Sequence, residues 1–270
     1  MKVRVAALIL PMIFTPLEAQ WLNYPTPGIP RLSNGKPNLA APAPRTANRK
    51  PDLSGIWELE PAHCSLDGVG TCGQDYTGGP EFGNLAARLN GDLPYQPWAA
   101  ELIKQRAPGG GKDDPVALCQ PAGALRLLTY PPPRKIVQNP GLILILSERD
   151  VTFRQIFTDG RPLPRDPNPS FNGYSVGKWE GDTLAVETIG FRDGIWLDRK
   201  GSPITEAAKM TERFRRLNFG NLEIEITIDD PKAYTKPWTV KLHEMLVPDT
   251  ELLEYYCQEN EKDTAHMVGK

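Results

Sequence analysis

The clearest structural signal in the chain is Asn221-Leu222-Glu223-Ile224-Glu225-Ile226-Thr227-Ile228-Asp229, in which apolar and polar residues alternate. Successive side chains of a β-strand point to opposite faces of the sheet, so this period of two indicates a strand. One face of that strand meets a hydrophobic core and the other meets water.

Similar short apolar runs recur from Leu53 onward, separated by glycine, proline and aspartate, which favours strands joined by tight turns. Turn residues at 148–150, 180–182, 218–220 and 248–250 are compatible with antiparallel hairpins. We therefore predict an all-β fold, either an antiparallel lipocalin-like barrel or a bent sandwich of about ten strands. The predicted strands are 55–60, 135–138, 142–148, 151–157, 174–180, 183–190, 209–217, 221–229, 238–246 and 252–257.

One helix is predicted, over 98–106, because Pro97 precedes a run of good helix formers that ends before Pro108 and three glycines. The helix belongs to an insertion, residues 61–134, which is rich in glycine and proline and holds three of the four cysteines. We expect this insertion to form a loop-rich cap on a β-barrel domain that spans 54–257, followed by a C-terminal tail at 258–270.

The N-terminus has the features of a secretory signal peptide over residues 1–19. Lys2 and Arg4 precede the apolar stretch 5–17, and Ala19 is a small residue before a plausible cleavage point. The stretch contains two prolines and is shorter than the about 20 apolar residues that a membrane-spanning helix needs. The sequence therefore predicts a secreted or periplasmic protein with no integral membrane segment after cleavage.

A proline-rich N-terminal arm follows at 20–53 and contains a repeat, since the pattern of residues 30–39 returns fourteen positions later at 44–53. So many prolines exclude a helix or an interior strand and favour extended or turn conformations. Two interpretations remain open. The arm is either a spacer or a belt laid over the barrel, with four apolar anchors: Trp21, Tyr24, Ile29 and Leu39.

The charge balance and the cysteines restrict the classes of function. The formal net charge of -2 provides no basic excess to neutralise phosphates, so we expect no nucleic-acid partner. An even number of cysteines suits an oxidising compartment. Three pairings are possible, and we favour Cys64 with Cys72 and Cys119 with Cys257. The alternative, a metal site, is disfavoured because the cysteines lack zinc-ribbon spacing, and we predict no metal and no cofactor.

Two resemblances follow from motifs. The segment Asp-Leu-Ser-Gly-Ile-Trp-Glu-Leu at 52–59 resembles the Gly-x-Trp opening strand of lipocalin-like barrels, which implies that Trp57 closes the barrel floor. Four further motifs resemble a large family of secreted bacterial proteins of the acidobacterial type, a likeness that implies export and a β-rich fold but no particular activity. They are Gly-Lys-Pro-Asn-Leu (35–39), Phe-Thr-Asp-Gly-Arg-Pro (157–162), Gly-Tyr-Ser-Val-Gly-Lys-Trp-Glu-Gly-Asp-Thr-Leu (173–184) and Thr-Ile-Asp-Asp-Pro-Lys-Ala-Tyr-Thr-Lys-Pro-Trp (227–238).

The run 157–198 concentrates carboxylates, aromatic residues and turn residues, and it is the predicted location of a functional site. Acid–base catalysis needs titratable groups in contrasting environments, whereas a binding cavity needs aromatic walls with a few polar anchors. Turn hydrogen bonding and core packing also explain such residues. The catalytic candidates are Asp159, Asp193, Asp198 and His243. The ligand-binding candidates are Arg161, Tyr174, Arg192, Trp196 and Trp238.

The favoured function is binding of a small amphipathic or aromatic molecule by a secreted barrel. Two alternatives remain open: a secreted hydrolase or lyase that acts on a glycoside or phenolic compound through paired carboxylates, and an envelope interaction protein. Binding predicts an apolar pocket with one or two polar anchors, whereas catalysis predicts two converging titratable groups. Whether the protein is an enzyme is left undecided by the sequence.

Overall fold

The computed structural model describes residues 25–60, 80–109, 111–149 and 151–257, and in them nine strands form one closed barrel. The strands follow one another around the barrel in sequence order, and β9 returns to pair with β1. This confirms the predicted barrel in preference to a bent sandwich. The strands are β1 (Gly55–Leu59), β2 (Arg134–Asn139), β3 (Leu142–Ser147), β4 (Phe153–Phe157), β5 (Tyr174–Glu180), β6 (Thr183–Ile189), β7 (Lys209–Arg216), β8 (Asn221–Asp229) and β9 (Trp238–Leu246).

Neighbouring strands are antiparallel except for β4 and β5, which are parallel. A ring of nine strands cannot alternate in direction throughout, so the prediction of a purely antiparallel barrel is wrong at this one place. Parallel neighbours need a connection that returns along the sheet, and residues 158–173 supply it. The connection rejoins the barrel where Ser170 N–H donates to Gly190 O at 3.0 Å. The two strands share only the pairs Ile156–Ser175 and Phe157–Val176.

The predicted tenth strand is also wrong. In the described residues 252–257, Tyr255 makes only an isolated bridge with Arg149. The pairing of β9 with β1 explains this, because a closed barrel leaves no free edge for another strand.

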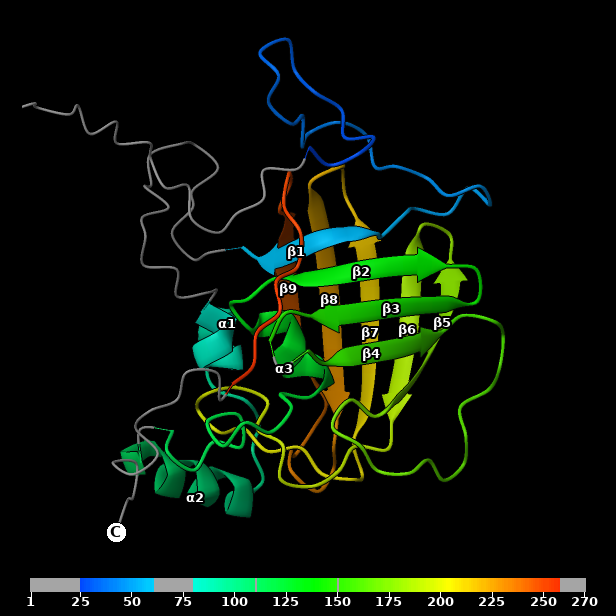
Figure 1. The fold of residues 1–270 in the computed structure, drawn as a ribbon. Helices are drawn as coiled ribbons and strands as arrows, with labels where there is room; N and C mark the ends of the chain where they lie inside the picture. Colours follow the sequence, from blue (N-terminus) through cyan, green and yellow to red (C-terminus); the bar gives the residue numbers. More distant parts are fainter. Residues whose placement is uncertain (1–24, 61–79, 110, 150, 258–270) are drawn as a thin grey trace, which may run out of the picture.

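The barrel interior holds the main hydrophobic core. The alternation in β8 places Leu222, Ile224, Ile226 and Ile228 inside, each at most 1% exposed, as the sequence predicted. In Figure 1, β1 to β4 lie in front of β6 to β9 and cross them, so that the core is enclosed between the two sets.

The segment between β1 and β2 supplies the helices seen at one side of the barrel in Figure 1. The predicted helix is confirmed as α2 (Pro97–Arg106), whereas the shorter α1 (Pro80–Gly83) and α3 (Ala124–Thr129) were not predicted. The predicted disulfide between Cys119 and Cys257 is present and ties this segment to the C-terminal residues. Cys64 and Cys72 lie outside the described residues, so that pairing stays a prediction.

The N-terminal arm lies against the opposite end of the barrel (Figure 1). Gly220 N–H donates to Leu39 O at 2.8 Å, and Phe219 N–H donates to Ala41 O at 2.7 Å. Leu53 is buried, and the indole N–H of Trp57 donates to its carbonyl at 3.0 Å. These contacts favour the belt over the spacer. Of the predicted anchors, Ile29 is buried and Leu39 packs on the core, while Trp21 and Tyr24 lie outside the described residues.

Candidate ligand-binding site

A pocket of about 430 Å³ lies where β4 and β5 diverge. The two strands pair only at Ile156–Ser175 and Phe157–Val176, so residues 153–155 of β4 pair with β3 on one side but have no paired strand on the β5 side. The volume falls within the usual range for small-molecule pockets. The lining residues are Pro121, Val151, Thr152, Phe153, Arg154, Gln155, Phe157, Ser170, Phe171, Asn172, Gly173, Tyr174 and Ser175.

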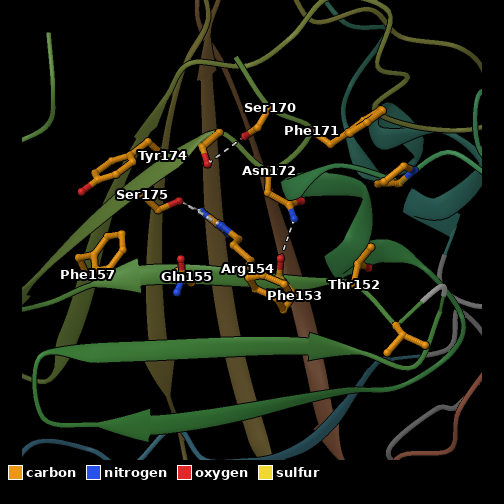
Figure 2. A pocket seen from close by; sticks show the side chains of 13 residues that line it. Thr152, Phe153, Arg154, Gln155, Phe157, Ser170, Phe171, Asn172, Tyr174 and Ser175 are labelled. Atoms are coloured by element: carbon orange, nitrogen blue, oxygen red, sulfur yellow. Dashed lines mark hydrogen bonds between the residues drawn. The ribbon is translucent and has the colours of Figure 1, made fainter. Parts of the chain in front are cut away.

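Aromatic side chains form the walls of the pocket. Phe157 and Tyr174 stack with ring centroids 5.3 Å apart on one side, and Phe171 lies on the other side (Figure 2). The guanidinium of Arg192 sits 4.6 Å from the centroid of Phe171 and fixes that ring from outside. Phe153 projects from the outer face of β4 and is 59% exposed, an unusual fraction for phenylalanine.

The inner side of the pocket is a buried polar network centred on Arg154. Arg154 is paired with Glu212 of β7 and also donates to Ser175 Oγ of β5 and Thr188 Oγ1 of β6. Both members of the ion pair are at most 1% exposed. Because β4 and β5 share so few ladder bonds, these side-chain hydrogen bonds join the strands on either side of the gap.

Asn172 contributes the one polar group in the pocket lining that is buried without a partner among the described residues. Its amide Nδ2 donates to Phe153 O at 2.9 Å (Figure 2). A carbonyl can only accept, so the orientation of this amide is fixed and Oδ1 is the group left over. A buried acceptor without a donor costs about 1–3 kcal/mol.

A second hollow of about 530 Å³ continues from the pocket along the outer face of β3 and β4. It shares Val151, Thr152, Phe153 and Gln155 with the first, so Phe153 stands between the two. The remainder of its lining is mostly apolar: Leu144, Leu146, Ser147, Leu252, Leu253 and Glu254.

The structure brings three of the predicted site residues together at the edge of the pocket. Arg161 forms a bidentate ion pair with Asp159 and donates to the hydroxyl of Tyr174 at 3.2 Å. Its guanidinium also lies 3.9 Å from the centroid of Phe157. The hydrogen bond from Arg161 lowers the pKa of Asp159 below its ordinary value, so this carboxylate is ionised at neutral pH. Tyr174 lines the pocket itself.

Four other predicted residues lie in the loop between β6 and β7, and one of them is Arg192, whose guanidinium contacts Phe171. Asp198 is fully buried and accepts hydrogen bonds from Leu85 N–H and from the backbone and hydroxyl of Ser202. Burial raises its pKa, although these bonds oppose the shift. Trp196 is buried under the guanidinium of Arg106, 4.3 Å from its ring, and exposed Asp193 accepts from a backbone N–H. Asp198 therefore joins this loop to the cap.

The remaining two predicted residues belong to β9. Trp238 is buried in the core against Tyr234, with ring centroids 5.3 Å apart, and its indole N–H has no hydrogen-bond partner among the described residues. His243 lies on the outer face, opposite Glu223 of β8. The three predicted carboxylates thus contact different partners, and none of them lines the described pocket between β4 and β5.

The residues that sequence reasoning missed are Phe153 and Asn172. Phe153 could have been found from the sequence. The alternation of β4 places Phe153, Gln155 and Phe157 on the solvent side, and two of these three residues are aromatic. The role of Asn172 depends on the parallel pairing of β4 and β5, for which the sequence held no signal.

Comparison with protein-family models and with curated proteins gave no match. Within the described ranges, no helix is long and apolar enough to cross a membrane. Nor do three or more histidine, cysteine or carboxylate side chains gather there in a group that could hold a metal ion.

Proposed function

We propose that this protein binds a small aromatic or amphipathic molecule in the pocket between β4 and β5. The observation that carries the proposal is the cavity of about 430 Å³ with aromatic walls, formed by the Phe157–Tyr174 stack and Phe171. Pockets of this kind take their affinity from apolar contact and their orientation from a few polar groups.

The lining suggests how the ligand lies. An aromatic ring fits between the Phe157–Tyr174 stack and Phe171, where offset or edge contacts contribute about 0.5–1.5 kcal/mol beyond area burial. An apolar substituent continues past Phe153 into the second hollow, which its leucines and Val151 make favourable.

Binding is favoured over the alternative of a hydrolase or lyase. General acid and base catalysis needs two titratable groups that converge on one substrate. Asp159 is held by Arg161, Asp193 by a backbone N–H and Asp198 by the cap, so the predicted carboxylates are in separate places. Arg154, which does line the pocket, is occupied with Glu212 and with neighbouring hydroxyls.

We further propose that the protein acts outside the cytoplasm. The disulfide between Cys119 and Cys257 supports this, because such bonds persist mainly in oxidising compartments. The signal peptide expected at 1–19 is in keeping with the same location and lies outside the described residues.

The test is a thermal-shift screen of the protein against phenols, fatty acids and sugars, followed by calorimetric titration of the hits. We expect phenols or other aromatic compounds to bind, and Phe157→Ala to weaken that binding about tenfold through loss of ring contacts. Trp98→Ala is the matched control, since Trp98 is 47% exposed on α2 and outside the pocket. The proposal fails if no aromatic compound binds, or if both variants weaken binding equally.

A further inference from the structure

The outer face of β3 and β4 is apolar along the length of both strands. On β3 it consists of the leucines at positions 142, 144 and 146, and on β4 of Phe153, Gln155 and Phe157. Val151 and Leu253 border this face and are 50% and 37% exposed. Exposed apolar patches of this kind usually mark an interaction surface.

The outer face on the opposite side of the barrel is different. The outward side chains of β7, β8 and β9 are mostly charged or polar, and ion pairs join Arg215 to Glu223 and Lys241 to Glu225. A sheet with one solvated face usually carries polar residues there. The apolar outer face of β3 and β4 is therefore not a requirement of the barrel itself.

Gln155 lies at the centre of the apolar face. Of the six outward side chains of β3 and β4 it is the only polar one, and it stands between Phe153 and Phe157 along β4 (Figure 2). The side chain is exposed, and its amide makes no hydrogen bond to another described residue. An amide has both donors and an acceptor, so a second amide that faces it satisfies both in a reciprocal pair.

A second copy of this chain matches the pattern, because in a two-fold dimer the same patch meets itself. An axis that lies in the interface and crosses the strands above Gln155 places the partner's Gln155 opposite Gln155. The same axis places the partner's Phe157 opposite Phe153. Leucine meets leucine in the same way, since Leu144 is paired in register with Gln155. No outward side chain of either strand is charged, so the two copies meet without repulsion.

We propose that the outer face of β3 and β4 is a dimer interface, in which Gln155 pairs with the partner's Gln155 across a two-fold axis. This goes beyond the proposed function and requires no ligand in the pocket. A lipid surface matches less well, because hydrocarbon offers no partner to the Gln155 amide. The two strands cover only about 20 by 10 Å, less than the about 800 Å² per partner of a standard interface. We therefore expect a weak dimer, with a Kd on the order of 100 µM.

Sedimentation velocity of the full chain from about 5 µM to about 1 mM is the first test. We expect the sedimentation coefficient to rise from that of a monomer to that of a dimer over this range. A chain that stays monomeric at about 1 mM overturns the proposal. If that monomer co-sediments with phosphatidylcholine vesicles, a lipid surface occupies the face instead.

The second test places charges at the axis. Gln155→Glu and Gln155→Lys each bring like charges together in a two-fold dimer, so we expect either variant alone to associate at least about tenfold more weakly. An equimolar mixture of the two variants should regain association, because opposite charges then face each other. If Gln155 did not meet the partner's Gln155, the mixture would associate no better than the separate variants, and the proposed axis would be wrong.

Thr239→Glu is the matched control. Thr239 is exposed on the outer face of β9, and the substitution adds one charge to a strand away from the proposed interface. We expect the Kd of its dimer to stay within about twofold of that of the unaltered protein. A loss as large as in Gln155→Glu would place the contact on another face and overturn the proposal. Because the mixture of Gln155 variants regains association only if both are folded, a folding defect is distinguished from a lost contact.

Discussion

Arg31 and Arg45, which lie fourteen residues apart in the N-terminal arm, make the same pair of contacts. Each guanidinium donates to the carbonyl four residues later and also to a barrel aspartate, Arg31 to Asp249 and Arg45 to Asp182. The backbone repeats too, since Leu32 N–H donates to Lys36 O and Thr46 N–H donates to Lys50 O, both at 2.9 Å. The sequence repeat is therefore one turn used twice to attach the arm.

Gly220 is where the arm can be detached by a single change. A Cβ added at Gly220 would lie 2.5 Å from Leu39 Cβ, which is too close for real atoms, and Leu39 O accepts the Gly220 N–H. We expect Gly220→Ala to displace the arm, with faster hydrogen exchange at residue 220 and faster proteolysis within 25–53. Gly83→Ala is the control, since nothing lies within 4 Å of its added Cβ. If hydrogen exchange and proteolysis were the same in both variants, the arm would not be held at Gly220.

The sequence predicted the strands well because their alternation is a local property. Nine of the ten predicted strands are present, and β5, β8 and β9 have the predicted bounds. The closure of the barrel is not local. Because nine is an odd number, closing the ring requires a parallel pair, here β4 and β5, and the closed ring leaves 252–257 without an edge to join. The short helix α3 was missed because its buried run 124–129 reads equally as a strand.

We predict that removing one member of the buried ion pair of Arg154 and Glu212 destabilises the fold more than replacing both. Glu212→Gln leaves the Arg154 charge buried and uncompensated, so we expect a loss of about 3–5 kcal/mol in the free energy of unfolding. Replacing both, as Arg154→Met with Glu212→Leu, should cost less than Glu212→Gln alone. Urea denaturation of the three proteins measures this.

The exposed ion pair of Arg213 and Glu180 is the control for the buried pair, because its side chains are 44% and 50% exposed. Arg213→Ala should change the free energy of unfolding by only about 0–1 kcal/mol. If Glu212→Gln were as mild as Arg213→Ala, the buried network would not be what joins the strands beside the pocket.

The candidate site was predictable in part. Tyr174 was predicted as an aromatic that lines a cavity and Arg161 as a loop cation beside aromatic residues; Tyr174 lines the pocket and Arg161 contacts it at the edge. Asp198 was chosen as a carboxylate beside aromatic residues and Trp238 as an aromatic residue, but both are buried and have structural partners instead. A sequence shows which side chains exist, whereas which of them share a cavity depends on the register of strands far apart along the chain.

Glu244 is predicted to make stability depend on pH. Burial raises its pKa to about 7, although Arg134 opposes the shift. The folded protein therefore keeps this proton up to about pH 7, whereas the unfolded chain loses it near the ordinary glutamate value of about 4.3. The folded state binds more protons between these two values, so stability falls as pH rises through that window and is level above it.

Glu244→Gln removes this dependence. The difference between the free energies of unfolding, variant minus unaltered protein, should increase from pH 5 to pH 7.5. Urea denaturation at each pH measures this difference. Leu242→Val on the same strand removes a methylene and no titrating group, so its loss should be the same at each pH. A constant difference for Glu244→Gln would show that its proton is not retained on folding.

The disulfide between Cys119 and Cys257 is predicted to be a major source of stability, because it joins residues 138 positions apart. Cross-linking so long a loop restricts the unfolded chain strongly, and removal of such a bond typically costs about 2–5 kcal/mol. We expect the double variant Cys119→Ser with Cys257→Ser to lose that amount in urea denaturation without reductant.

The disulfide also holds residues 252–254, which form one wall of the second hollow. In the double variant, binding of ligands with long apolar substituents should therefore weaken more than binding of phenol. Equal weakening of both would place the second hollow outside the ligand site. Any further loss when the double variant is reduced reports on Cys64 and Cys72, and thus tests the remaining predicted pair.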